Sequence, residues 1–556
     1  MILDDLRGAV RGEVLGDEQS LSKYSHDASI FEVKPQAVVQ PLDVEDIKSL
    51  VRFATEKNEQ GERVSLSGRA AGTDMSGGPL TESIVVDFMK HLNHVVSVSP
   101  EVNSQGVITG GSAVTEPGVF YRDFEKETMK VNLIMPSYPA SRELCAIGGI
   151  VSNNSGGEKT LMFGKTEDYV SRLKVVLSDG NEYEFRSLSP EELAKKRELK
   201  TFEGEIYRKM FKLLEENYET IQRARPDVSK NSAGYFLWNV WDKKKFDLTK
   251  LFVGAQGTLG LITEVEFQLV PVKKHSRMVI VSLRNTDVVS EMINVILSFK
   301  PESFESYDDK TLKLAMKFAP ELVRKLKKNI FVLAWEFLPS ILAMLRIGFP
   351  KLVLLVEFNG DNEAELEEKT KEVAKALKRF RSPVRRTRSE EEGKEYWEIR
   401  RESFSLLRGH VKDRHTVPFI DDVIVKPEHL PEFLPKLDAI LAPYKDKMIY
   451  TIAGHEGNGN FHIIPLMKIE DPETRALIPK ISDAVYDLVL EYGGSITAEH
   501  NDGIIRTPYL TKMYGEGVVK LFEDTKNIFD PKGIFNPGKK VRGTLEYAMS
   551  HIRERW

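Results

Sequence analysis

Three histidines and one glutamate in the C-terminal part of the sequence have the types and spacing of a metal site. His455 and His462 lie on either side of a glycine-rich turn, and Glu499 directly precedes His500 in a second stretch. Neutral imidazole nitrogens and a carboxylate oxygen are ligands for zinc or a similar divalent ion, and three protein ligands leave positions open for substrate. A single histidine more often only donates or accepts a hydrogen bond. Three of the eleven histidines gathered in glycine-rich stretches favour a site.

A loop at residues 65–78 has the composition of a backbone anion site. Glycines and small residues allow positive φ and direct successive N–H groups into one concavity. The loop lacks the lysine of a P-loop, and its glycines do not have the Gly-x-Gly-x-x-Gly spacing of a dinucleotide-binding turn. Two interpretations remain, an anion-binding loop or an ordinary glycine-rich surface turn.

Two further segments, 144–166 and 253–264, are also rich in glycine. Glycine inside a helix or strand costs about 0.5 to 1 kcal/mol relative to alanine, so we expect the first of these segments to be neither helix nor strand. Backbone wrapped closely around a flat ligand explains the composition better. The second segment has the same character and leads into a strand.

Length and composition describe an ordinary globular chain. With 556 residues, two or three domains are expected. The net charge of -5 gives no reason to expect nucleic acid. The one cysteine, Cys145, excludes intramolecular disulfides and leaves no thiolates for an iron–sulfur cluster. The first residues are acidic and lack a long apolar run, so we expect a cytoplasmic protein.

The pattern of apolar residues predicts an α+β fold. After a helical lead-in at 1–35, strands are expected at 37–41, 64–66 and 83–88, with a helix after the first. From about 275 the runs 278–283 and 352–358 predict strands, separated by charged helices such as 362–379. This second part reads as an antiparallel sheet backed by helices, in a separate cap domain.

The segment 330–349 is unusually apolar, and basic residues precede it. Three polar or helix-breaking residues interrupt it, so it lacks the 18 clean apolar residues of a transmembrane helix. Peripheral contact with a membrane surface is one interpretation. The other is a helix buried against the cap or against a partner subunit, such as a second copy in a homodimer.

The three glycine-rich segments, in this order, resemble the flavin-binding domain of the vanillyl-alcohol oxidase and para-cresol methylhydroxylase superfamily. The resemblance implies FAD, with its pyrophosphate on the first loop and its ring against the other two segments. No histidine lies within the first loop, so we expect the FAD to be non-covalent. The implied domains are a lead-in at 1–35, an FAD-binding domain at 36–272, a cap at 273–490 and a C-terminal helical segment at 491–556 that returns to the flavin. The implied flavin contacts are Ser67, Gly68, Arg69, Ala70, Ala71, Gly72, Thr73, Asp74, Pro136, Gly148, Gly149, Ser152, Asn153, Asn154, Gly156, Gly257, Thr258, Ile262 and Asn536.

The histidine stretches resemble the metal-dependent branch of that superfamily, the FAD-linked D-2-hydroxyacid dehydrogenases, which act on D-lactate, glycolate or D-2-hydroxyglutarate. The resemblance implies that His455, His462 and Glu499 hold a divalent metal, Zn, Mn or Fe. It also implies that His500 is the base and that Arg400 binds the substrate carboxylate. A divalent cation lowers the pKa of a coordinated hydroxyl, and a histidine titrating near neutrality can accept its proton.

The sequence departs from that branch at several positions. Asn458 stands where relatives have aspartate, Asn501 where a glycine usually follows the base, and Ala255-Gln256 where Ser-Glu is common. An alternative is an enzyme like alkylglycerone-phosphate synthase, which carries consecutive histidines, whereas no two histidines are adjacent here. Another is a flavin electron-transfer subunit. The electron acceptor stays open between a quinone, an iron–sulfur subunit and an electron-transferring flavoprotein.

Overall fold

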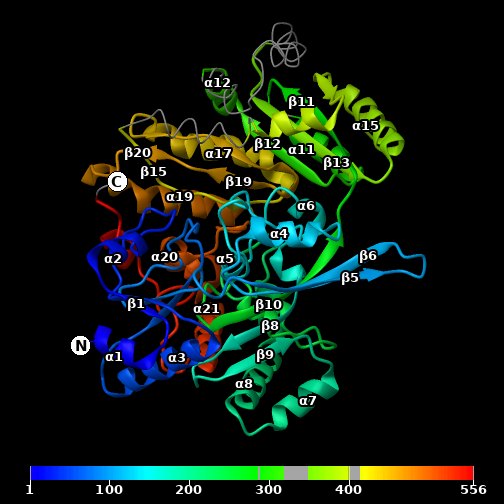
Figure 1. The fold of residues 1–556 in the computed structure, drawn as a ribbon. Coiled ribbons are helices and arrows are strands. Elements are labelled where there is room, and N and C mark those ends of the chain that lie inside the picture. Colours follow the sequence, from blue (N-terminus) through cyan, green and yellow to red (C-terminus); the bar gives the residue numbers. More distant parts are fainter. Residues whose placement is uncertain (1, 286–287, 318–347, 399, 401–412, 555–556) are drawn as a thin grey trace.

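The structure is a computed structural model that describes residues 2–285, 288–317, 348–398, 400 and 413–554 (Figure 1). Helices and mostly antiparallel sheets alternate along the chain, which confirms the α+β class. Three larger sheets organise the molecule, and a small one consists of β15 (His415–Thr416), β20 (Leu466–Met467) and β17 (Met448–Ile449).

The first sheet positions the loop at 65–78. Its order is β1 (Glu13–Leu15), β2 (Ala37–Gln40), β4 (Ile84–Asp87) and β3 (Leu66–Arg69), with β2, β4 and β3 parallel. Helix α3 (Val44–Glu59) begins at the N-cap Asp43 and buries Ile47, Leu50 and Val51 in the core of this layer. The strand expected at 64–66 runs instead from Leu66 to Arg69, so it includes the first residues of the glycine-rich stretch 65–78, and the loop continues from Ala70. The lead-in contains α1 (Ile2–Ala9) and α2 (Glu18–Tyr24), as expected, and also contributes β1.

The second sheet is antiparallel, in the order β5 (Val95–Val102), β6 (Ile108–Thr115), β10 (Leu261–Pro271), β8 (Val170–Val176) and β9 (Glu182–Arg186). A short β7 (Leu133–Ile134) also pairs with β10. The β5–β6 hairpin projects from the body of the molecule (Figure 1). Helix α8 (Phe202–Glu216) and the strands share one apolar core.

The third sheet has seven antiparallel strands, as expected for the second part of the sequence. Their order is β14 (Val384–Arg386), β11 (His275–Leu283), β13 (Leu352–Gly360), β12 (Ser303–Asp308), β18 (Ile452–His455), β19 (Asn460–Ile463) and β16 (Val423–Ile424). One face packs on α11 (Val289–Ser298), α15 (Glu363–Leu377), α17 (Leu430–Leu441) and α19 (Leu477–Glu491). The opposite face carries Met278, Ile280 and Tyr307, which share an apolar cluster with Tyr396 and Trp397. This alternation is the period of two expected for strands.

The segment 144–166 departs from expectation, because it contains the short helix α5 (Ile147–Asn153) with Gly148 and Gly149 inside it. The reason is close packing: a Cβ on Gly148 would lie 2.9 Å from the Cβ of Pro117. The helix ends at Asn154, which adopts the left-handed conformation at φ 50°. Glycine lowers the helix propensity here, but a larger residue at position 148 would clash with Pro117.

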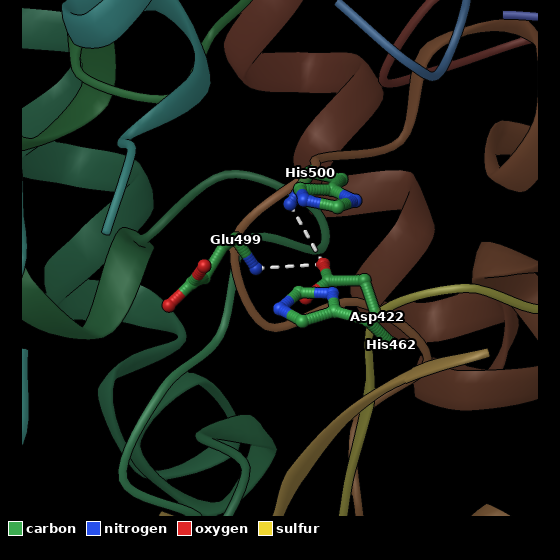
Figure 2. A group of neighbouring side chains, drawn as sticks. All are labelled: Asp422, His462, Glu499 and His500. Atoms are coloured by element: carbon green, nitrogen blue, oxygen red, sulfur yellow. Dashed lines mark hydrogen bonds between the residues drawn. The ribbon is translucent and has the colours of Figure 1, made fainter. Parts of the chain in front are cut away.

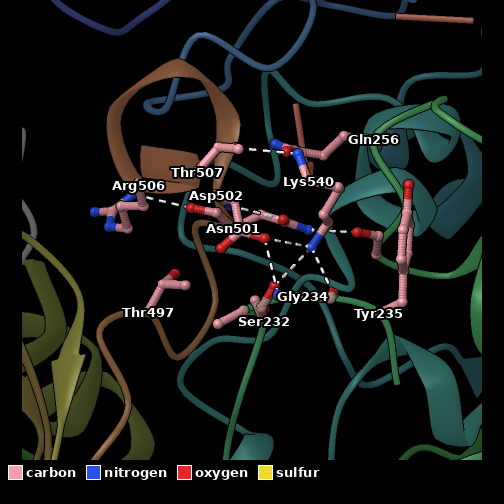
Figure 3. A network of polar contacts seen from close by, with 12 residues as sticks. Ser232, Gly234, Tyr235, Gln256, Thr497, Asn501, Asp502, Arg506, Thr507 and Lys540 are labelled. Carbon is pink, nitrogen blue, oxygen red and sulfur yellow. Dashed lines mark hydrogen bonds and ion pairs between the residues drawn. The ribbon is translucent and has the colours of Figure 1, made fainter. Parts of the chain in front are cut away.

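The C-terminal part returns to the first two sheets. After α21 (Leu510–Phe529), the backbone of Ile534 and Asn536 pairs with Leu66 in β3. Lys540 is fully buried and donates to the carbonyls of Ser232 and Gly234 while pairing with Asp502 at 2.9 Å (Figure 3). Further helices in the described part of the chain include α4 (Tyr121–Met129), α6 (Thr160–Phe163), α7 (Pro190–Glu198), α9 (Tyr218–Ala224), α10 (Thr249–Phe252), α12 (Asp309–Lys317), α18 (Pro472–Arg475), α20 (Gly503–Arg506) and α22 (Leu545–Ser550).

The apolar segment at 330–349 lies outside the described residues except for its last two. In the part of the chain that the structure describes, no helix is long and apolar enough to cross a bilayer.

Candidate functional site

One cavity of about 300 Å³ brings the glycine-rich segments and the polar cluster together. Backbone of the first loop, of helix α5 with its flanks and of the third segment forms one part of the wall, and Arg400 with the histidines forms another. The flavin contacts implied by the resemblance that line it are Gly68, Arg69, Ala70, Ala71, Gly72, Thr73, Asp74, Gly148, Gly149, Ser152, Asn153, Gly156, Gly257 and Ile262. All five residues assigned to the metal and the chemistry, Arg400, His455, His462, Glu499 and His500, line it too.

Five residues assigned to the flavin do not line the cavity: Ser67, Pro136, Asn154, Thr258 and Asn536. Asn536 instead joins the loops, because its side-chain oxygen accepts from Ser67 Oγ at 2.8 Å and its nitrogen donates to the carbonyls of Gly78 and Gln256. Thr258 Oγ1 lies 2.6 Å from the hydroxyl of Tyr235. These side chains support the cavity wall from behind.

The first loop faces the cavity through its backbone, and its one arginine is committed elsewhere. The guanidinium of Arg69 donates to the carbonyls of Tyr24 and His26. Gly72, at φ +71°, makes room for it, since a Cβ there would lie 2.4 Å from an Arg69 nitrogen. Within the loop, the N–H groups of Ser76 and Gly78 donate to the carboxylate of Asp74.

The rest of the wall fits a flat ligand such as FAD. Gly257 lines the cavity at φ +69°, and a Cβ there would meet nothing within 4 Å, so this backbone faces open space. Gly149 has only the Cβ of Ala70 near it, at 3.8 Å. Cys145 also lines the cavity, and burial raises the pKa of its thiol to about 12, which argues against a thiolate nucleophile.

Glu305, on β12, joins the side chains of His455 and Arg400. Its Oε1 lies 2.6 Å from Nδ1 of His455, at the end of β18, and its Oε2 forms an ion pair with Arg400. All three side chains are at most 9 % exposed. Burial opposes ionisation of Glu305, but Arg400 and His455 together outweigh burial and lower the pKa of the carboxyl. The Nε2 of His455 is thereby left to face Glu499.

Glu499 is held between a lysine and a histidine. Its Oε1 pairs with the ammonium of Lys230 at 2.5 Å, and its Oε2 lies 3.5 Å from Nε2 of His455. Lys230 is fully buried. Burial opposes the charge on Glu499, but the Lys230 ammonium and the nearby His455 together outweigh burial and hold the pKa of the carboxyl well below its usual range. Glu499 is thus a carboxylate at neutral pH.

Two consecutive aspartates, Asp421 and Asp422, hold the remaining histidines. Asp422 accepts from the backbone N–H groups of Glu499 and His500, both at 2.7 Å (Figure 2). Asp421 accepts from Nδ1 of His462 at 3.2 Å, and its other oxygen lies 2.7 Å from Nδ1 of His500 without hydrogen-bond alignment. The rings of His462 and His500 stack, with centroids 5.0 Å apart.

The negative charges of these aspartates raise the pKa of His500. Burial lowers the pKa of its imidazole, but the carboxylates of Asp422 and Asp421 outweigh burial and raise the pKa to about 9. In the absence of another cation, His500 is therefore an imidazolium at pH 7. A divalent cation nearby would oppose that charge and favour the neutral base.

Donor atoms of His462, Glu499, His500 and Asp422 lie within 4.8 Å of one another, so the chemistry of a metal site is present. Asp422, however, already accepts from Thr497, Asn460 and the two backbone N–H groups. A carboxylate with this many donors has little capacity left for an ion. His455, which the resemblance implies as a ligand, is not in this group, although its Nε2 lies 3.5 Å from Oε2 of Glu499.

Two family models match the chain. The model described as FAD binding domain matches residues 35–186, and the model described as FAD linked oxidases, C-terminal domain, matches residues 272–540. The chain therefore combines an FAD-binding domain with a C-terminal domain of the FAD-linked oxidase type.

Curated proteins and solved structures similar to this chain carry names of flavoenzymes. D-2-hydroxyglutarate dehydrogenase of Pseudomonas putida is 29% identical over 551 residues, which cover 97% of this chain and 51% of the relative, so the chain spans about half the length of that protein. Glycolate oxidase subunit GlcD of Bacillus subtilis is 27% identical over 523 residues, covering 93% of this chain and 91% of the relative. Among solved structures, p-cresol methylhydroxylase with substrate bound has a TM-score of 0.65 at 15% identity, covering 97% of this chain and 96% of that one.

Three residues that depart from the motifs of the D-2-hydroxyacid dehydrogenases have contacts that suit their side chains. Asn501 adopts φ 69°, a conformation that asparagine tolerates in place of glycine, and its amide donates to the carbonyl of Gly254 at 2.8 Å. Gln256 donates to Ser76 and accepts from the N–H of Gly503, a combination that a carboxylate could not make. Asn458 donates to Ser229 Oγ at 3.0 Å.

Sequence reasoning did not predict four residues that contact the site: Lys230, Glu305, Asp421 and Asp422. A signal was present for the aspartates, because both interrupt the apolar run 417–425. Charges inside a buried strand pattern need partners. Lys230 and Glu305 had no comparable signal, since their partners lie 269 and 150 positions away.

Proposed function

We propose that this chain is an FAD-dependent dehydrogenase that oxidises a D-2-hydroxy acid to the 2-oxo acid and passes the electrons to an acceptor other than NAD. One observation carries the proposal: a single cavity is lined by the glycine-rich backbone on one side and by Arg400, His455, His462, Glu499 and His500 on the other. We also propose the division into an FAD-binding domain at 36–272, a cap at 273–490 and a C-terminal segment at 491–556.

The residues have separable roles in the proposed reaction. Arg400 binds the substrate carboxylate, and its buried Nε, which makes no hydrogen bond within the described residues, is a free donor for it. His500 accepts the hydroxyl proton. Bound FAD supplies the acceptor for the hydride that leaves the same carbon.

His455, His462 and Glu499 would hold a divalent cation, Zn, Mn or Fe. Such an ion supplies Lewis acidity toward a hydroxyl oxygen. What supports the set is its chemistry, two imidazoles and a buried ionised carboxylate on one cavity wall. His500 adjoins Glu499 in the chain, so a proton acceptor lies beside the proposed ligands.

The names of the relatives support the substrate class, since they include D-2-hydroxyglutarate dehydrogenase, glycolate oxidase subunit and D-lactate dehydrogenase. An enzyme like alkylglycerone-phosphate synthase stays the alternative, disfavoured because no two histidines are adjacent. A silent electron-transfer subunit is disfavoured because base, arginine and ligand set are all present. The acceptor we propose is a quinone, an iron–sulfur subunit or an electron-transferring flavoprotein.

The test is anaerobic reduction of the FAD-loaded protein by a panel of D-2-hydroxy acids, followed by loss of the flavin's visible absorbance. We expect bleaching by at least one acid, slower after chelation and restored by added Zn²⁺ or Mn²⁺. The L-enantiomers serve as the matched control. Indifference to every hydroxy acid would overturn the activity, and bleaching unaffected by chelation would overturn the metal.

A further inference from the structure

We propose that Asp421 is a positioning residue that fixes one tautomer on both His462 and His500, and so leaves the Nε2 atom of His500 as the proton acceptor. The inference deepens the proposed function and rests on it. Asp421 is fully buried, and each of its two oxygens approaches the Nδ1 atom of a different histidine, at 3.2 Å for His462 and 2.7 Å for His500.

The short distance to His500 determines which of its nitrogens carries a proton. A bare Nδ1 would place its lone pair 2.7 Å from the negative charge of a carboxylate oxygen, and the two repel even though the contact lacks hydrogen-bond alignment. The carboxylate therefore favours the tautomer with hydrogen on Nδ1. The same argument applies to His462, whose Nδ1 donates to Asp421 Oδ1. In the neutral form of each ring, the Nε2 atom is then the one with a free lone pair.

The neighbouring groups hold this arrangement in place. Arg506, also fully buried, donates to the backbone carbonyl of Asp421 at 2.7 Å. Asp422, at φ 69°, turns the chain so that its own carboxylate binds the backbone of Glu499 and His500. The two aspartates have different partners: Asp422 accepts hydrogen bonds from the backbone of Glu499 and His500, and Asp421 contacts the rings of His462 and His500.

The consequence for the reaction is a defined proton path. The O–H bond of the hydroxyl breaks and its proton binds Nε2 of His500. The C–H bond of the same carbon breaks as a hydride, which bound FAD would accept. The substrate thus loses two electrons and two protons, one proton to the imidazole and the other within the hydride. Asp421 stays ionised throughout and offsets the positive charge formed on the ring. The free Nε2 of His462 is likewise available as a ligand.

The test is Asp421→Asn in the FAD-loaded protein with ¹⁵N-labelled histidine. Long-range ¹H–¹⁵N NMR spectra distinguish Nδ1–H from Nε2–H tautomers of a neutral ring, so they are recorded well above the His500 pKa of about 9, at which half of the rings still carry both protons. We expect Nδ1–H for both rings in the parent protein and loss of that state in at least one ring of the variant. The signals are assigned with His462→Gln and His500→Gln. Flavin reduction by the active hydroxy acid should fall by roughly 10- to 100-fold, the usual effect of removing a ligand-orienting partner.

Two comparisons keep the outcome interpretable. Asp87→Asn removes another buried carboxylate, one that binds Tyr24 and Gln40 and touches no imidazole, and should leave both tautomers and flavin reduction unchanged. Asp421→Glu should restore the Nδ1–H state in part. An Nε2–H tautomer in the parent protein, or an unchanged spectrum in Asp421→Asn, would overturn the proposal. The tautomers are measured without substrate, so a failure of the hydroxy-acid activity would not be mistaken for a failure of the positioning role.

Discussion

Lys230 places its ammonium nitrogen 2.5 Å from Oε1 of Glu499, with the lysine side chain fully buried and the glutamate 5 % exposed. The pair sets a positive charge directly beside the proposed metal ligands. It keeps Glu499 ionised and commits one of its oxygens, so that the other oxygen faces His455.

Replacing Lys230 should show how much the ion pair contributes to the stability of the folded protein. Lys230→Met leaves a buried carboxylate without its partner, which destabilises proteins by about 3 to 5 kcal/mol. We expect a lower thermal midpoint and a larger gain on adding Zn²⁺ than in the parent, because the ion would replace the missing charge. The control is Lys520→Met, which removes an exposed pair with Asp524 and should change little. Equal midpoints for the two variants would contradict the assignment.

His500 should be required for chemistry and dispensable for the cofactor. In the His500→Ala variant the alanine side chain cannot accept a proton. The rate of flavin reduction by the hydroxy acid should therefore fall by about 10²- to 10⁴-fold. FAD content, measured from absorbance after gel filtration, should match the parent protein. Turnover at the parental rate would show that another group is the base.

Glu456 should make stability depend on pH. Burial raises the pKa of its carboxyl to about 7, with Ser306 as its one hydrogen-bond donor among the described residues. The native state therefore holds a proton that the unfolded state releases near pH 4.5, so stability falls as pH rises from about 4.5 to 7 and is constant above. The difference amounts to roughly 3 kcal/mol.

The measurement is the thermal midpoint of Glu456→Gln and the parent from pH 5 to 8. The neutral amide removes this titration, so the variant should gain on the parent as pH rises and should be the more stable protein at pH 8. A midpoint difference that does not change across this range would contradict a raised pKa for Glu456.

Gly156 couples the flavin side of the cavity to the proposed metal side. A Cβ at this position would lie 3.0 Å from Oε1 of Glu499 and 2.8 Å from Oγ1 of Thr160. We expect Gly156→Ala to displace Glu499 and weaken binding of Zn²⁺ to the FAD-loaded protein, measured by calorimetry. Gly517→Ala, on α21 with nothing within 4 Å, should bind the ion normally and gain about 0.5 to 1 kcal/mol in stability. Normal zinc binding by Gly156→Ala would contradict the contact.

The sequence was informative where the chemistry depends on residue type and short spacing. His455 and His462 lie on two strands of one tight hairpin, β18 and β19, so their proximity followed from a seven-residue separation. The α+β class followed from alternating strand and helix patterns. The glycines of the three segments predicted backbone close to a flat ligand, and residues of all three segments line one cavity.

The sequence was silent where contacts join distant segments. Glu305 reaches His455 across 150 positions and Lys230 reaches Glu499 across 269, and no local pattern marks such pairs. Helix α5 was missed for a related reason: Pro117 on another segment packs so closely that Gly148 is needed inside a helix. Asn536 lay in a matching motif, yet its side chain joins the loops behind the cavity.

The pairing of Leu66 with Ile534 and Asn536 has a consequence for biosynthesis. The loop that begins after β3 is complete only when residues more than 460 positions later have left the ribosome. Contacts of such long range form slowly, because the intervening chain must be closed first. We expect a ribosome-bound chain stalled before residue 530 to be unable to retain FAD, and the cofactor to enter after translation has passed this point.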